Sequence, residues 1–257
     1  MAYTGESYDE LIRRSYGYNS QEQSLSPAWA TVRTLYEKNY IQDGDNEDKI
    51  PKKIHQIWLG GKVPDKYREF MDSWQMFNPT WEYKLWMDMD ANELMRNHTV
   101  YNKCSNHGMK SDILRYEILR RYGGVYVDTD FECLKPFDDL MSLRFFTGIS
   151  YDKEMVLYIG IIASVPNHAI INVCVENIKK PFVGNDAVTI MNLTGPYYFT
   201  RCFLEGVKTD DMGVVAFPMD FFYPLPNNQR NTSNPYIFIR PVSYAIHHWA
   251  VSWIKQK

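Results

Sequence analysis

The chain has 257 residues, 45% of them hydrophobic and 15% aromatic, and a formal net charge of −3. This composition is typical of a packed globular protein and excludes an intrinsically disordered one. The weak negative charge provides no basic field that would attract nucleic acid. The sequence also lacks a run of about 20 apolar residues, so we predict no transmembrane segment.

Residues 1–49 are predicted to form a helical extension. Ser7 and Glu10 have capping-box spacing, which predicts a short helix through Ser15. A second helix is predicted from Pro27, followed by an acidic loop and a boundary near residue 50. The apolar positions of this helix recur at helical spacing: Trp29, Val32, Leu35 and Tyr36. We favour a helical cap on the next domain; a role in binding the acceptor or a partner is the alternative.

Residues 50–257 are predicted to form one α/β domain. A strand, Lys53–Leu59, ends at two glycines and precedes a helix, Pro64–Phe77, a strand, Trp81–Trp86, and a short helix capped by Asp90. This β-α-β-α order is typical of nucleotide-binding domains, which bind ligands at strand C-termini. The later predicted strands are Phe145–Gly148, Val156–Ala163, Val214–Phe217, Tyr236–Arg240 and Tyr244–His248. The later predicted helices are Ala169–Lys179 and one that begins near Pro196.

The stretch 109–124 predicts a helix and its end. Asp112, Arg115 and Leu119 fall on one face of that helix. Gly123 and Gly124 end it, because a residue free to adopt positive φ is favoured there. Asp112 and Arg115 have two interpretations. One is a surface ion pair worth a few tenths of a kcal/mol; the favoured one is a ligand-binding pair beside the next strand.

Residues 125–130, VYVDTD, predict that strand. Alternate side chains share a face, so Tyr126, Asp128 and Asp130 point the same way. Two carboxylates this close repel each other unless a cation lies between them. Oxygen ligands suit Mg²⁺ or Mn²⁺. A D-x-D triplet alone is often a solvated turn, but its place after a capped helix and an apolar strand favours a metal site.

Three segments together resemble one enzyme family. They are S-D-x-x-R-Y followed by G-G-x-Y-x-D-x-D (Ser111–Asp130), IHQIWLGG (Ile54–Gly61) and HHWAVSW (His247–Trp253). Their order is similar to that of the sugar-binding DXD glycosyltransferases of the family 32 type. That group includes yeast-type initiating α-mannosyltransferases, bacterial capsule and lipopolysaccharide sugar transferases, and the catalytic domains of large clostridial glucosylating toxins.

The resemblance implies a GT-A fold, an α/β architecture with a largely parallel central sheet flanked by helices. It implies retaining, metal-dependent transfer of a hexose from a nucleotide sugar, a UDP-sugar or GDP-mannose, to a glycan or other hydroxyl acceptor. The expected metal is Mn²⁺ or Mg²⁺. A catalytically silent nucleotide-sugar-binding domain and a nucleotide-sugar hydrolase are the alternatives. We expect a cytoplasmic protein, with peripheral membrane attachment as the alternative.

The resemblance also assigns residues. Catalysis is assigned to Asp112, Arg115, Asp128 and Asp130. Donor binding is assigned to Ile57, Trp58, Ser111, Asp112, Arg115, Tyr126, Asp128, Ser252 and Trp253, where Trp58 stacks on the base or, alternatively, packs in the core. Asp130 is the expected direct metal ligand, and Asp128 holds the ribose or reaches the metal through water.

Two points of the assignment stay open. The resemblance implies that a late histidine completes the metal shell. Only one of His247 and His248 can point inward, because neighbours in a strand face opposite sides, and the motif match favours His248. Where many relatives carry Asn, this chain has Ile159 or Gly160. One contact of the family is therefore left without an assigned counterpart.

Overall fold

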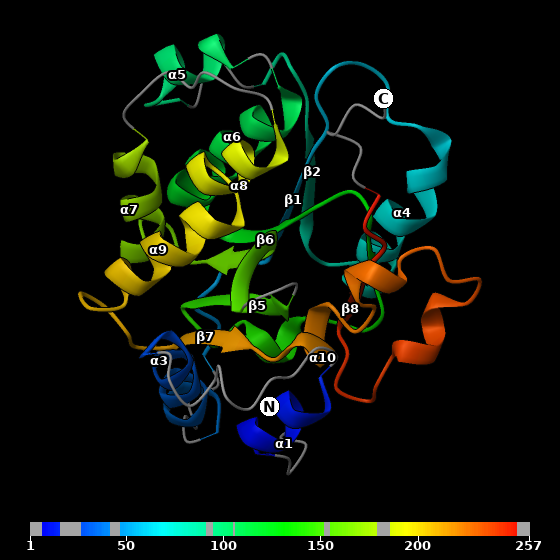
Figure 1. The fold of residues 1–257 in the computed structure, drawn as a ribbon. Helices are drawn as coiled ribbons and strands as arrows, with labels where there is room; N and C mark the ends of the chain where they lie inside the picture. The colour runs from blue at the N-terminus through cyan, green and yellow to red at the C-terminus, as the bar shows by residue number, and fades with distance from the viewer. Residues whose placement is uncertain are drawn as a thin grey trace.

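The structure is a computed structural model that describes residues 7–15, 27–41, 47–90, 95–104, 106–151, 155–178 and 186–250. Its centre is a six-stranded sheet with strand order β2-β1-β3-β6-β5-β7 (Figure 1). The strands are Lys53–Ile57 (β1), Glu82–Trp86 (β2), Gly124–Val127 (β3), Phe145–Tyr151 (β5), Met155–Ser164 (β6) and Val214–Phe217 (β7). A second, two-stranded sheet pairs Phe131–Cys133 (β4) with Ala245–His247 (β8).

The main sheet is mixed but largely parallel. β1 runs parallel to both β2 and β3, and β5 runs parallel to β7. β6 is antiparallel to its two neighbours, β3 and β5. Helices flank this sheet (Figure 1), so the α/β class expected from the sequence is confirmed. The helices of this domain are Arg68–Phe77 (α4), His98–Lys103 (α5), His107–Tyr122 (α6), Ala169–Asn177 (α7), Ala187–Leu193 (α8), Pro196–Gly206 (α9) and Met219–Phe222 (α10).

Helix α6 carries the predicted Asp112 and Arg115, and both of its ends follow from local chemistry. The Asn106 side chain caps the first turn by accepting from the backbone N–H groups of Gly108 and Met109. The helix ends at Gly123, whose φ is +62°. A Cβ on Gly124, where φ is +90°, would lie 2.7 Å from the Lys53 carbonyl oxygen. The glycine pair therefore both ends α6 and lets β3 pair closely with β1.

The N-terminal extension packs against the edge of the sheet that β7 forms. Its helices are Tyr8–Arg14 (α1) and Pro27–Tyr36 (α3), and α3 continues into a π-helical turn, Glu37–Ile41. The Tyr40 ring lies 4.9 Å from that of Phe217 and 5.9 Å from that of Phe221. The Asn39 side-chain amide donates to the carbonyl oxygens of Asp211 and Val214. This packing supports the cap interpretation, which stays a prediction.

Several expected elements differ from those observed. The predicted strand Tyr236–Arg240 is wrong: Pro235–Phe238 is a 3-10 helix, with Pro235 in its first turn and the Asn234 side chain accepting from the Tyr236 N–H. β3 ends at Val127, so Asp128 and Asp130 lie in a turn closed by the Phe131 N–H and the Asp128 carbonyl oxygen. The helix predicted after Asp90 falls mainly outside the described residues. Among the described residues, no helix is long and apolar enough to cross a membrane.

Candidate active site

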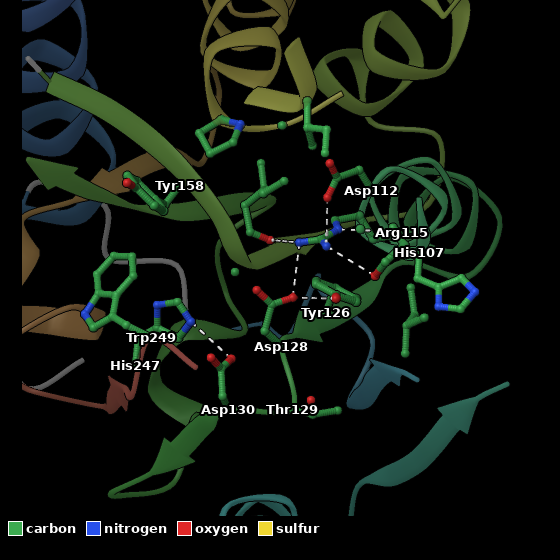
Figure 2. A pocket seen from close by; sticks show the side chains of 18 of the residues that line it. His107, Asp112, Arg115, Tyr126, Asp128, Thr129, Asp130, Tyr158, His247 and Trp249 are labelled. Atoms are coloured by element: carbon green, nitrogen blue, oxygen red, sulfur yellow. Dashed lines mark hydrogen bonds and ion pairs between the residues drawn. The ribbon is translucent and has the colours of Figure 1, made fainter. Parts of the chain in front are cut away.

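A cavity of about 540 Å³ opens where β1 and β3 end (Figure 2). This is the edge at which α/β sheets bind ligands. Its walls come from the residues after β1, from α6, from the D-x-D turn, from β6, and from the segments around α8, α9 and β8. The cavity brings together all the predicted site residues of the described part except His248: Ile57, Trp58, Ser111, Asp112, Arg115, Tyr126, Asp128, Asp130 and His247.

Arg115 is the centre of a buried charge network (Figure 2). Its guanidinium is 3.0 Å from Asp112 Oδ1 and 3.2 Å from Asp128 Oδ1. It also donates to the Ile159 carbonyl oxygen at 2.7 Å and lies over the Tyr126 ring at 4.4 Å. The side chain is only 5% exposed. A planar fork with five N–H donors satisfies this set of acceptors, so the surface-ion-pair interpretation of Asp112 and Arg115 is wrong.

The carboxylate of Asp112 is held from two sides. Oδ1 faces Arg115, and Oδ2 accepts from the Thr194 hydroxyl at 2.8 Å. Burial raises the pKa of Asp112 to about 6, although Arg115 and Thr194 both act to lower it. Ser111, one residue earlier, accepts from the same guanidinium at 3.3 Å.

Asp128 and Asp130 face the cavity in different environments. Asp128 accepts from the Tyr126 hydroxyl at 2.6 Å, and burial raises its pKa, with a further contribution from Asp130. Burial would also raise the pKa of Asp130, but His247 and the Ala250 N–H lower it below its usual value. Oδ2 of Asp130 accepts from that N–H at 2.7 Å. Asp130 is therefore the carboxylate that stays ionised most readily.

The D-x-D turn and β8 together form a group that could hold a metal ion. One ligand atom each from Asp128, Asp130 and His247 lie within 4.8 Å of one another. His247 Nε2 is 3.1 Å from Asp130 Oδ1, and its ring stacks on Phe131 at 4.5 Å. Two carboxylates and one imidazole are a donor set that suits Mn²⁺.

The expectation that His248 completes this group is not supported by its position. Its ring stacks on Phe70 at 4.0 Å, and its Nε2 is 2.9 Å from Glu132 Oε2. Neighbouring side chains at a strand end point to opposite faces. Since Phe131 pairs with His247 across the β4–β8 ladder, His247 is the one that faces the D-x-D turn.

The other end of the cavity is formed after β1. Trp58 is half-buried there, and its ring lies 5.3 Å from that of Tyr67. Both rings line the cavity, together with His107 at the start of α6. A Cβ on Gly60 would lie 2.3 Å from the His107 ring, so the glycine lets the imidazole pack against this turn. An aromatic wall of this kind fits a nucleobase.

Ile159 and Gly160, where the resemblance to the family implies an Asn, both contribute to the site through the backbone. The Ile159 backbone carbonyl holds Arg115, and Gly160 leaves room for the D-x-D turn. A Cβ on Gly160 would lie 2.9 Å from the Phe131 ring and 3.1 Å from Asp128 Oδ2. Sequence reasoning missed Trp249, which lines the cavity, and the buried Thr194, which bonds to Asp112. Trp249 has a φ of +53° and donates from Nε1 to the Leu225 carbonyl oxygen. Ser252 and Trp253 lie outside the described residues.

Comparisons with known proteins agree with this geometry. The family model described as the glycosyltransferase sugar-binding region containing a DXD motif matches residues 64–146. An uncharacterised glycosyltransferase of Acanthamoeba polyphaga mimivirus is 30% identical over 73% of this chain and 78% of the relative. Inositol phosphoceramide mannosyltransferase 1 of Schizosaccharomyces pombe is 31% identical over 85% of this chain and 72% of the relative. Among solved structures, the PaToxG glycosyltransferase superposes with a TM-score of 0.53 at 18% identity, covering 70% of this chain and 76% of that one.

The fold and the carboxylate-lined cavity define a glycosyltransferase with the GT-A architecture. The chain belongs to the family of glycosyltransferases whose sugar-binding region contains the DXD motif, here Asp128-Thr129-Asp130.

Proposed function

We propose that the protein transfers a hexose from a nucleoside-diphosphate sugar to a hydroxyl acceptor in a metal-dependent reaction that retains the anomeric configuration. The observation that carries this proposal is the group of Asp128, Asp130 and His247 beside the Arg115 network in one cavity. When bound, a divalent ion such as Mn²⁺ or Mg²⁺ would stabilise the negative charge of the departing diphosphate. Asp130 and His247 are its proposed ligands, with Asp128 bound directly or through water.

The roles proposed for the other residues follow from their positions. Trp58 and Ile57, at the aromatic end of the cavity, contact the nucleoside, and Tyr126 and Asp128 bind near the ribose. Asp112 and Arg115 hold hydroxyl groups of the sugar, and Ser111 orients the Arg115 guanidinium. Ser252 and Trp253, outside the described residues, remain proposed diphosphate contacts.

The cavity offers little support for a covalent route to retention. A retaining double displacement needs a carboxylate free to act as a nucleophile. Asp112 and Asp128 both face Arg115, and Asp130 is held by His247 and the Ala250 N–H. We therefore propose a displacement on one face of the sugar, in which the departing phosphate oxygen takes the proton of the acceptor hydroxyl. The bond from C1 to the acceptor oxygen forms as the bond from C1 to the phosphate oxygen breaks.

The mannosyltransferase relatives suggest which substrates to test first. GDP-mannose is the first donor to try, with UDP-glucose as the second, and inositol phosphoceramide in detergent is a lipid acceptor that the fission-yeast relative's name suggests. Product would be measured with and without acceptor, and with Mn²⁺ or excess EDTA. Acceptor-dependent product that is lost in EDTA supports the proposal. Sugar release that acceptors do not change would identify a nucleotide-sugar hydrolase. Stabilisation by a donor without turnover would identify a silent binding domain, and neither turnover nor stabilisation by any donor would contradict the proposed function.

Ligand binding provides a check that needs no acceptor. A donor at a hundred times its Kd adds about 2.7 kcal/mol to the free energy of unfolding of a protein that binds it only when folded. A thermal-shift panel of UDP, GDP, UDP-glucose and GDP-mannose, each with and without Mn²⁺, therefore identifies the base. Full turnover in excess EDTA would contradict the proposed metal dependence.

A further inference from the structure

Thr194 lies at the junction of α8 and α9, directly before the Gly195-Pro196 pair that starts α9. Its side chain is fully buried, and its hydroxyl donates to Asp112 Oδ2 at 2.8 Å. The two residues are 82 positions apart in the sequence. A hydrogen bond to a buried carboxylate is among the stronger ones in proteins, because the acceptor is charged.

The backbone of Thr194 is fixed independently of Asp112. Its carbonyl oxygen accepts from the Tyr116 hydroxyl at 2.8 Å, and its N–H donates to the Ile190 carbonyl oxygen at 3.1 Å. A Cβ on the next residue, Gly195, would lie 2.9 Å from the Met191 Cα, so this tight turn depends on glycine. The hydroxyl therefore reaches Asp112 from a rigid position.

Thr194 and Arg115 hold different oxygens of the same carboxylate. Arg115 lies one turn further along the same helix and pairs with Oδ1. One contact of this kind does not prevent the carboxylate from rotating about its bond to Cβ. The Thr194 hydroxyl fixes the second oxygen and with it the plane of the group. Ile190 and Met191, which line the cavity, lie in α8 just before this junction. The segment from Ile190 to Gly195 thus forms part of the cavity wall and also fixes the orientation of the Asp112 carboxylate.

We propose that Thr194 is a positioning residue for the donor sugar: it orients Asp112 so that the remaining lone pairs of the carboxylate accept from sugar hydroxyls. This inference rests on the proposed function. It adds that the Thr194–Asp112 contact is what makes the protein bind a nucleotide sugar in preference to the free nucleotide. Nucleotide binding itself depends on the other end of the cavity, around Trp58 and the D-x-D turn.

The test compares the affinities of Thr194→Val and Thr194→Ser for matched ligands. Calorimetry with Mn²⁺ would measure Kd for UDP and UDP-glucose, and for GDP and GDP-mannose. We expect Thr194→Val, which keeps the shape but loses the hydroxyl, to weaken nucleotide-sugar binding about tenfold or more, while nucleotide diphosphate affinity stays within about twofold. Thr194→Ser keeps the donor and is expected to restore the wild-type ratio of the two Kd values.

Two controls separate this role from a structural one. Thr200→Val removes a half-buried hydroxyl from α9 that bonds to the Pro196 carbonyl oxygen and the Leu157 N–H. It is expected to lower the melting temperature as Thr194→Val does, with an unchanged ratio of Kd values. In an Asp112→Ala background, Thr194→Val is expected to have no further effect on that ratio, because residues that act as one unit are not additive.

The outcomes separate this inference from the function on which it rests. Equal weakening of nucleotide and nucleotide-sugar binding by Thr194→Val, or an effect that persists in Asp112→Ala, would overturn the positioning role while leaving the glycosyltransferase proposal intact. A wild-type protein that binds none of the four ligands would overturn the proposed function and this inference with it.

Discussion

The carboxyl ends of β1 and β3 and the β7 edge of the central sheet are held together by opposite kinds of interaction. Where β1 and β3 end, one buried guanidinium joins the buried Asp112 and the partly exposed Asp128, and a third carboxylate pairs with a histidine. At the β7 edge, aromatic rings make the contacts, with Tyr40 packed on Phe217 and Phe221. The charged pairs near that edge, such as Lys38 with Asp211, are half-exposed.

The difference shows which part of the molecule carries stability and which carries function. Replacing a buried ionic network with apolar residues is often neutral or stabilising, so such a network is weak evidence of stability. Apolar contacts stabilise in proportion to the area they bury. We therefore infer that the sheet is stabilised mainly by its apolar core and by the contacts at the β7 edge. The charged residues at the ends of β1 and β3 serve the function of the site more than its stability.

The largest effect is expected from Arg115→Met. This change leaves the buried Asp112 and the partly exposed Asp128 without their shared cation. Breaking a buried ionic network costs about 3–5 kcal/mol, and the partial exposure of Asp128 places the expected loss at the lower end of that range. Urea unfolding at pH 7 would measure the loss of free energy, and donor binding would be lost at the same time. Lowering the pH should restore part of the stability, because burial raises the pKa of both carboxyls and protonation removes their charge. A variant of wild-type stability would show that the network is dispensable for folding.

Asp130→Asn is expected to lower activity strongly and stability slightly, because His247 and the Ala250 N–H stabilise the ionised carboxylate in the fold. It preserves the size of the side chain but removes the charge proposed to hold the metal. We expect kcat to fall about 10²–10³-fold, as when one preorganised group for charge stabilisation is removed. The Mn²⁺-dependent rise in melting temperature should also be lost. Asp65→Asn on the exposed surface is the matched control; near-wild-type transfer by Asp130→Asn would refute the metal role.

Leu35→Ala tests the apolar edge. Leu35 is buried on the face of α3 that packs near β7, and removing a buried leucine side chain costs about 2–3 kcal/mol. Melting temperature and urea midpoint would both fall. At a temperature where the variant is folded, we expect kcat/KM within about twofold of wild type. A large fall in kcat/KM with unchanged stability would instead favour the alternative role of residues 1–49 in binding an acceptor or partner.

The smallest effect is expected from His168→Asn and concerns pH. His168 caps α7 by accepting from the Ile170 N–H, and burial lowers its pKa to about 4, with Arg144 lowering it and Asp210 raising it. The unfolded chain binds a proton near pH 6.5 that the folded chain does not, so stability is lost as pH falls from 6.5 to about 4. Asn keeps the cap without titrating. Urea unfolding at several pH values should show that the free energy of unfolding falls less steeply with falling pH in the variant, by at most about 1.4 kcal/mol per pH unit. Equal slopes in the two proteins would contradict the assignment of this pH dependence to His168.

Local signals in the sequence predicted much of the fold. The glycine pair after α6, the capping box of α1 and Pro196 at the start of α9 each mark an element that the structure contains. These signals work because they depend on the φ preferences and hydrogen bonds of a few consecutive residues. The strand predicted at Tyr236–Arg240 failed for a related reason. Its β-branched pattern favours a strand, but Pro235 and the Asn234 cap start a 3-10 helix instead.

The rest of the site depends on contacts between distant segments. The choice between His247 and His248 follows from the register of β8 against β4, which no local pattern specifies. Thr194 was missed because its partner lies 82 residues earlier. The G-P pair that follows Thr194 did predict the turn and helix α9. It gave no indication that the turn supplies a buried hydroxyl that bonds to Asp112.

The pairing of β4 with β8 also sets the time at which the group of Asp128, Asp130 and His247 becomes complete. Asp130 and His247 are separated by 117 positions, and the Ala250 N–H that holds Asp130 follows three residues later. A ribosome adding about 5–20 residues per second needs about 6–23 s between the first of these residues and the second. During that interval the nascent chain carries the D-x-D turn without its histidine. The charged centre is therefore assembled last, on a sheet whose six strands have already been synthesised.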